Sequence, residues 1–265
     1  MNTLNRHRIG AVARRQFYAT KRALPRWFDM SVWPMLDVIV WGSLGAYVAQ
    51  QNGASGAATP YLLAGIVMFH VLFQTQIAIS TGFMEETWTR NLLNVMTTPV
   101  REVEYALGLA LYGVVKLALG MTAVTLTAWL LFGFDTASIG WALVPVAFVL
   151  LLAGWALAHV SIGLLLRFGP SAEILTWGLM FLAMALSGVF NPVSSIPGPL
   201  QPLARVLPTS KAFEATRAVL AGEPIPWGTL GVAVIGSVVV GALALAFVIR
   251  MLHVFRARGY VTRFS

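Results

Sequence analysis

The feature that most constrains this chain is a series of six long apolar stretches within 265 residues. An α-helix rises about 1.5 Å per residue, so a hydrocarbon core about 30 Å thick requires roughly 20 consecutive apolar residues. The six stretches reach or approach that length and occupy residues 31–49, 61–83, 105–134, 139–166, 174–190 and 228–252. The sequence therefore predicts an all-α membrane protein with six transmembrane helices.

Composition and the placement of charge agree with this prediction. The chain is 58% hydrophobic and 11% charged, whereas soluble proteins are about 25% charged. Lys and Arg concentrate before the first stretch and after the sixth, and loops rich in these residues stay in the cytoplasm. We therefore expect a single domain over residues 1–265 in the plasma (inner) membrane, with both termini cytoplasmic. The net charge of +8 then reflects topology rather than nucleic-acid binding.

Residues 1–29 are predicted to form an amphipathic helix that lies in the membrane interface. At about 100° per residue, one side of the helix is apolar and the other is basic. The apolar side consists of Ile9, Val12, Ala13, Phe17, Leu24, Trp27 and Phe28. Pro25 predicts a bend where the chain turns from lying along the bilayer to crossing it. The alternative is a basic tail that only follows the positive-inside rule.

Two connections carry more structure than simple turns need. In the cytoplasmic segment 84–99, apolar residues recur at helical spacing, which predicts a short helix that docks on another protein or rests on lipid. The external segment 191–227 holds seven of the thirteen prolines. Within it, a short helix before Pro208 and a second one from Lys211 to a stop at Gly222 predict a re-entrant excursion. An ordinary extracellular loop is the alternative.

Among the polar residues inside the predicted spans, four are candidates for a functional role: Asp37 in the first, His70 and Gln74 in the second, and Lys116 in the third. A charge at this depth must face protein or water, so Asp37 and Lys116 are expected to pair with each other, with substrate contact as the alternative. His70 and Gln74 either line a cavity or form hydrogen bonds between helices. No histidine has a partner at metal-ligand spacing, and the sequence contains no cysteine. We therefore expect no metal site and no thiolate chemistry.

The whole plan resembles that of ABC type-2 exporter permeases. The most specific parts are residues 90–99, with the sequence RNLLNVMTTP, and residues 187–192, with the sequence SGVFNP, followed by Leu207 and Pro208. These strings are similar to the coupling helix of the family and to the entry of its re-entrant helices. The resemblance implies a second permease subunit, in a homodimer or a heterodimer, and two copies of a cytoplasmic ABC ATPase subunit. It also implies that the following residues contact the ATPase: Trp88, Arg90, Asn91, Leu92, Leu93, Asn94 and Arg167.

The sequence itself places the energy source outside this chain. A Walker loop requires Gly-Lys followed by Ser or Thr, but Lys21, Lys116 and Lys211 follow Thr20, Val115 and Ser210. We expect no catalytic residue and no cofactor here, with ATP bound by the partner subunit. The function indicated is export of an amphipathic or lipid-linked substrate: a drug, a lipid, a glycolipid or a lipid-linked saccharide. A secondary transporter and a membrane-embedded enzyme are the alternatives.

Overall fold

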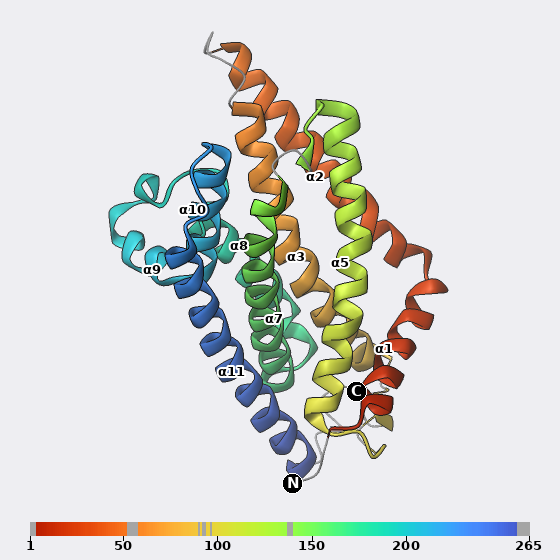
Figure 1. The fold of residues 1–265 in the computed structure, drawn as a ribbon. Coiled ribbons are helices and arrows are strands. Elements are labelled where there is room, and N and C mark those ends of the chain that lie inside the picture. Colours follow the sequence, from red (N-terminus) through yellow and green to blue (C-terminus); the bar gives the residue numbers. More distant parts are fainter. Residues whose placement is uncertain are drawn as a thin grey trace.

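A computed structural model describes residues 4–51, 58–89, 91, 94–95, 97–136 and 140–258, and within these ranges the fold is entirely helical. Five helices are long and apolar enough to cross a membrane, which makes the chain a multi-pass membrane protein. They are α2 (Leu24–Gln51), α3 (Ala58–Trp88), α5 (Glu102–Phe132), α7 (Leu143–Phe168) and α11 (Trp227–Arg258) (Figure 1). The start of α1 and the end of α11 lie at the same end of the bundle (Figure 1).

The predicted N-terminal helix is divided in two. Helix α1 (Arg6–Lys21) is capped by Arg22, and α2 begins at Leu24. The bend therefore precedes Pro25, which lies in the first turn of α2. At that position a missing backbone N–H breaks no helical hydrogen bond. The break lies two to three residues before the bend expected at Pro25, and the first long helix begins seven residues before the predicted apolar stretch.

Helix α1 packs on the bundle through a stripe that is mostly polar. It buries Val12, Gln16 and Thr20, which recur every four residues and share one face. Phe17 and Leu24, from the predicted apolar side, are 42% and 80% exposed. Phe17 thus faces away from the protein, where the bilayer surface would cover it, whereas Val12 from the same predicted side is buried. The buried stripe is bonded to α3 and α5.

Helix α8 (Glu173–Leu186) occupies the fifth predicted span but has only 14 residues, a length of about 21 Å. Its neighbours α7 and α11 run in the same direction (Figure 1). Ala156 of α7 faces Gly241 of α11, and Gly163, seven residues further along α7, faces Phe247, six residues further along α11. The two helices are therefore parallel. The segment between α7 and α11 must therefore return the chain along the length of the bundle, and α8 is the first part of that return. A 3-10 turn, η2 (Pro170–Ala172), leads into α8.

The proline-rich segment after α8 folds into short helices, as predicted. After η3 (Val193–Ser195) and η4 (Gly198–Leu200), the chain forms α9 (Gln201–Val206) and α10 (Pro208–Leu220). Gly222 follows α10 with a φ of +77°, a left-handed conformation that favours glycine and ends the helix. Helix α10 buries Phe213 and packs against α3, α7 and α11. Another 3-10 turn, η1 (Gly140–Ala142), precedes α7.

The turn between α8 and α10 is held by polar contacts and by a close approach to α3. The Ser187 and Thr209 hydroxyls lie 2.6 Å apart, and the Arg217 guanidinium donates to the Gly188 carbonyl at 2.6 Å. At Gly65 of α3, an added Cβ would lie 2.5 Å from the Val189 carbonyl oxygen. Only glycine allows this turn to pack so closely on α3.

We therefore expect Gly65→Ala to destabilise the protein by about 1–3 kcal/mol, because the new methyl group meets backbone that cannot rotate away. The measurement is thermal unfolding of the purified chain in detergent. Gly178→Ala in α8 is the matched control, since no atom lies within 4 Å of its added Cβ. That control should be neutral or slightly stabilising. A Gly65→Ala protein as stable as the Gly178→Ala protein would contradict the close packing.

Candidate functional site

A buried carboxylate joins the N-terminal helix to the segment that follows α3. The Glu86 side chain is 3% exposed and lies near the end of α3. It is 2.6 Å from the Arg15 guanidinium and 2.8 Å from the Asn91 side-chain amide, which donates to it. The Gln16 amide donates to it at 3.2 Å and to the Gly82 carbonyl at 3.3 Å. We call Arg15, Gln16, Glu86 and Asn91 the Glu86 cluster.

The Glu86 cluster satisfies the physical requirement for burying a charge. A carboxylate is expensive to remove from water unless several donors replace its hydration. Here those donors come from α1 and from residue 91, so the charge is stable only while both segments remain in place. A displacement of either segment would expose or unpair Glu86. The cluster therefore couples the positions of α1 and the segment after α3.

The expected coupling residues lie at this end of the bundle, as far as the structure describes them. Trp88 is the last residue of α3 and is 52% exposed. The Asn94 amide donates to the Asn91 side chain at 2.9 Å, and Asn94 is itself exposed. Arg90, Leu92 and Leu93 lie outside the described residues. The contact of these residues with an ATPase stays a prediction.

The boundary of the predicted coupling segment differs from the structure at its start. Residues 84–88 belong to the last turn and a half of α3 rather than to a separate helix. Among the described residues that follow, Asn94 and Val95 are helical and α5 starts at Glu102. The second predicted span ended at residue 83, before Glu85 and Glu86, whereas α3 continues through both to Trp88. Their cationic partners allow the helix to continue.

The connection between α7 and α8 lies beside the same segment. Arg167 is exposed in the last turn of α7. Beyond it, Ala172 is buried in a hydrophobic cluster with Phe83 and Met84 of α3, and Val95 packs against this cluster. Ala172, after α7, and Val95, after α3, therefore lie in one cluster although they come from two distant parts of the sequence. The contact of Arg167 with an ATPase stays a prediction.

A second group of charges lies where α1 turns into α2. Arg26 forms an ion pair with Glu85, and the Lys116 ammonium lies 2.8 Å from an Asp29 carboxylate oxygen. A cavity of about 170 Å³ separates these pairs. It is lined by Gln16, Pro25, Arg26, Asp29, Thr81, Gly82, Glu85, Trp88, Tyr112 and Lys116.

The predicted pairing of Asp37 with Lys116 was wrong. Lys116 is 4% exposed and pairs with Asp29, which the sequence places just before the first apolar stretch. Asp29 and Asp37 both lie on α2 and are separated by eight residues, or about 12 Å along the axis. A single lysine cannot reach both. Asp37 instead lies 3.4 Å from the Nε2 atom of His70, which is fully buried.

Gln74 has a structural role that follows from Pro34. Proline has no N–H, so Pro34 in the middle of α2 leaves the carbonyl four residues earlier without its helical donor. That carbonyl belongs to Met30, and the Gln74 side-chain amide donates to it at 3.4 Å. Gln76 similarly donates to Ser161 of α7 at 3.2 Å. Hydrogen bonding between helices therefore accounts for these two glutamines.

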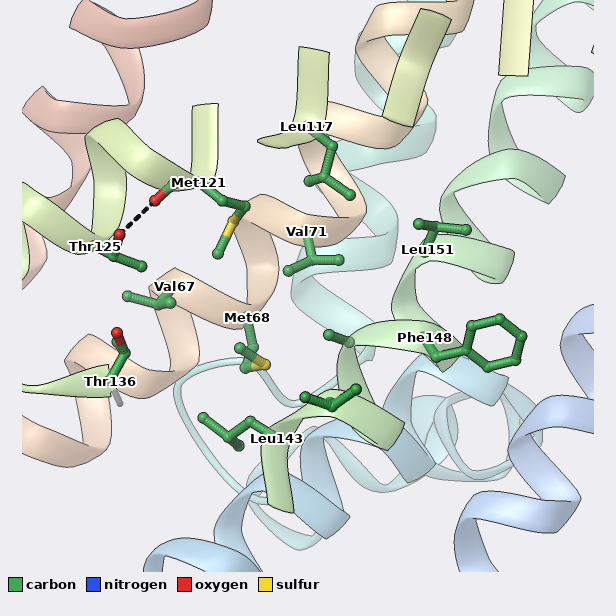
Figure 2. Close-up of a pocket in the computed structure, with 12 residues that line it drawn as sticks. Val67, Met68, Val71, Leu117, Met121, Thr125, Thr136, Leu143, Phe148 and Leu151 are labelled. Atoms are coloured by element: carbon green, nitrogen blue, oxygen red, sulfur yellow. Dashed lines mark hydrogen bonds between the residues drawn. The ribbon is translucent and has the colours of Figure 1, made fainter. Parts of the chain in front are cut away.

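A larger cavity, of about 400 Å³, is different in character. Figure 2 shows side chains of α3, α5 and α7 pointing into this space. Its lining is almost wholly apolar, and the Thr125 hydroxyl donates within its own helix to the Met121 carbonyl at 2.8 Å. The lining residues are Val67, Met68, Val71, Leu117, Met121, Thr125, Thr136, Leu143, Val144, Ala147, Phe148 and Leu151. This cavity suits hydrocarbon and provides no group that recognises charge.

The spanning helices define a helical multi-pass membrane protein. The family model described as ABC-2 type transporter matches residues 7–221. The chain therefore belongs to the ABC-2 type transporter family, whose members work with an ATPase partner. A search of the curated proteins finds no match.

Four functional candidates were not predicted from the sequence: Arg15, Gln16, Asp29 and Glu86. One signal for them was available, because Val12, Gln16 and Thr20 form a stripe at four-residue spacing that includes two polar residues. Polar residues on such a stripe indicate a helix that packs on polar partners. The partners themselves, Glu86 and Tyr112, are distant in sequence and gave no comparable signal.

Proposed function

We propose that the chain is the permease subunit of an ATP-driven exporter. It works with a second permease subunit, as a homodimer or heterodimer, and with two copies of a cytoplasmic ATPase subunit that bind the ATP. The observation that carries this proposal is the Glu86 cluster, in which the segment after α3 is bonded through a buried carboxylate to α1. A movement imposed on Asn91 by a partner would reach α1 through that carboxylate.

The proposal includes six crossings of the plasma membrane with both termini in the cytoplasm. The parallel directions of α7 and α11 support it, because the chain must return between them. Helix α8 with the turn at Ser187–Asn191 makes the fifth crossing, and α9 and α10 fill the outer part of the bundle as a re-entrant unit. The exported substrate is amphipathic or lipid-linked, and the apolar cavity in Figure 2 would accommodate its apolar part.

Photo-crosslinking tests the ATPase contact. A benzoyl-phenylalanine in place of Trp88, which is 52% exposed, should crosslink to a protein that carries a Walker motif. The same substitution at Trp141, which is 87% exposed at the opposite end of the bundle, is the matched control and should give no such product. Mass spectrometry of the crosslinked band identifies the partner. Equal yields at both positions, or no ATPase at Trp88, would argue against the proposal.

A further inference from the structure

Asp37 is a carboxylate on an otherwise apolar and open helix face. It lies in the middle of α2, about 20 Å from either end of the helix. Its side chain is 50% exposed, and its neighbours on the helix, Leu36 and Val40, are 43% and 61% exposed. A carboxylate at this depth is strongly unfavourable in hydrocarbon, so this face meets protein or water rather than lipid.

The described part of the chain does not neutralise Asp37 in the way that it neutralises the other intramembrane charge. Lys116 and Asp29 form a close pair at 2.8 Å. Among the described residues, the only side chain that pairs with Asp37 within 4 Å is the imidazole of His70, at 3.4 Å. Within that part of the chain, neither His70 ring nitrogen makes a hydrogen bond, although both are buried. A buried, unpartnered imidazole and a half-exposed carboxylate thus lie together at the edge of an open face.

Aromatic side chains lie near this carboxylate, one turn away on α2 and beside His70 on α3. Trp41 lies one turn along α2 and stacks on Phe190, with ring centroids 3.7 Å apart. From α3, the Phe73 ring lies 5.9 Å from that of His70 and 6.3 Å from that of Trp177 in α8. Trp41, Phe73, Trp177 and Phe190 are all partly exposed. Part of each ring therefore remains open to contact with a molecule that approaches Asp37.

We propose that Asp37 and these aromatic side chains recognise the positively charged group of an amphipathic organic cation. The carboxylate supplies the opposite charge, and Trp41, Phe73 and Trp177 supply apolar contact and cation–π attraction. This inference rests on the proposed export function and names the chemical class of its substrate. The apolar cavity of Figure 2 cannot distinguish a cationic substrate from an anionic or neutral one, since its lining carries no charge.

Two ions of the same shape and opposite charge test the inference. Binding of tetraphenylphosphonium and of tetraphenylborate is measured on the full chain in lipid nanodiscs, after subtraction of the binding to empty nanodiscs. Asp37→Asn should weaken tetraphenylphosphonium binding by about tenfold or more, because it removes the opposing charge. The same change should leave tetraphenylborate binding equal or stronger. Asp37→Glu should stay within about threefold of the original chain.

The controls keep every outcome informative. Glu223→Gln removes a carboxylate from an exposed position outside the helices and should leave binding of both ions unchanged. If Asp37→Asn does not fold, Trp177→Leu provides the test and should weaken tetraphenylphosphonium binding by about threefold. Unchanged tetraphenylphosphonium binding in Asp37→Asn, or in Trp177→Leu when it replaces that variant, overturns the inference.

Binding is measured without an ATPase, so this inference and the export function can fail separately. Loss of the Trp88 crosslink with charge-selective binding intact would count against the export function alone. A lack of charge selectivity with the crosslink intact would count against the cation site alone.

Discussion

Asp29→Asn should lower the free energy of unfolding by about 3–5 kcal/mol, because it leaves a buried ammonium without its counter-charge. Lys116 is 4% exposed in the middle of α5, and its Nζ atom lies 2.8 Å from Asp29. Asp29 is 34% exposed, so the carboxylate is reachable by water while the lysine is not. Chemical or thermal unfolding of the purified chain in detergent measures the loss.

A double-mutant cycle identifies the partner of Lys116. Lys116→Met places a side chain of similar length and no charge in apolar surroundings, so it should cost much less than Asp29→Asn. The double variant Asp29→Asn/Lys116→Met should recover part of the loss, with an interaction free energy of about 0.5–3 kcal/mol. The cycle that combines Asp37→Asn with Lys116→Met should be additive. Coupling of Lys116 to Asp37 instead of Asp29 would show that the observed pairing is wrong.

Glu86→Ala should abolish the response of α1 to ATP binding by the ATPase. The change removes the acceptor shared by Arg15, Gln16 and Asn91, and energetic coupling between distant sites typically corresponds to about 5- to 150-fold in an equilibrium. Because the chain contains no cysteine, a single Phe17→Cys substitution places a spin label on the exposed side of α1. In the complete transporter, ATP should change the mobility of this label, and Glu86→Ala should abolish the change.

Glu214→Gln is the control for this experiment. Glu214 is 57% exposed and pairs with Lys211 one turn away on the surface of α10. A surface pair of this kind contributes little, so ATP should still alter the label in this variant. A persistent ATP response in Glu86→Ala would mean that the Glu86 cluster does not carry the coupling.

The helices themselves were largely predictable, but their ends were not. Apolar length identified the five long helices because the cost of burying backbone in hydrocarbon forces a span to be helical. The end of α3 was misplaced because Glu85 and Glu86 look like residues of a solvated loop. Arg26 and Arg15 neutralise them in the fold. No periodicity within residues 84–99 contains that information.

For the polar residues, too, the sequence predicted part of the result and the fold decided the rest. The position of Lys116 inside a predicted span indicated that its charge needs a partner, and the structure confirms that it has one. The identity of the partner depended on how α2 packs against α5. That packing places Asp29 rather than Asp37 against the ammonium. Gln74 was likewise noticed as a polar residue in a span. Its partner became apparent only when α2 and α3 brought it to the carbonyl freed by Pro34.

The sequence alone determined that this is a helical membrane protein of a recognisable transporter plan, with a stop at Gly222 and no nucleotide-binding loop. These properties depend on composition, local spacing and backbone conformation, which act over a few residues. The tertiary structure decided the Glu86 cluster, the Lys116 partner and the aromatic surroundings of Asp37. Each of these joins groups far apart in the chain, and ion pairs and hydrogen bonds depend on distances of a few ångströms that only packing sets.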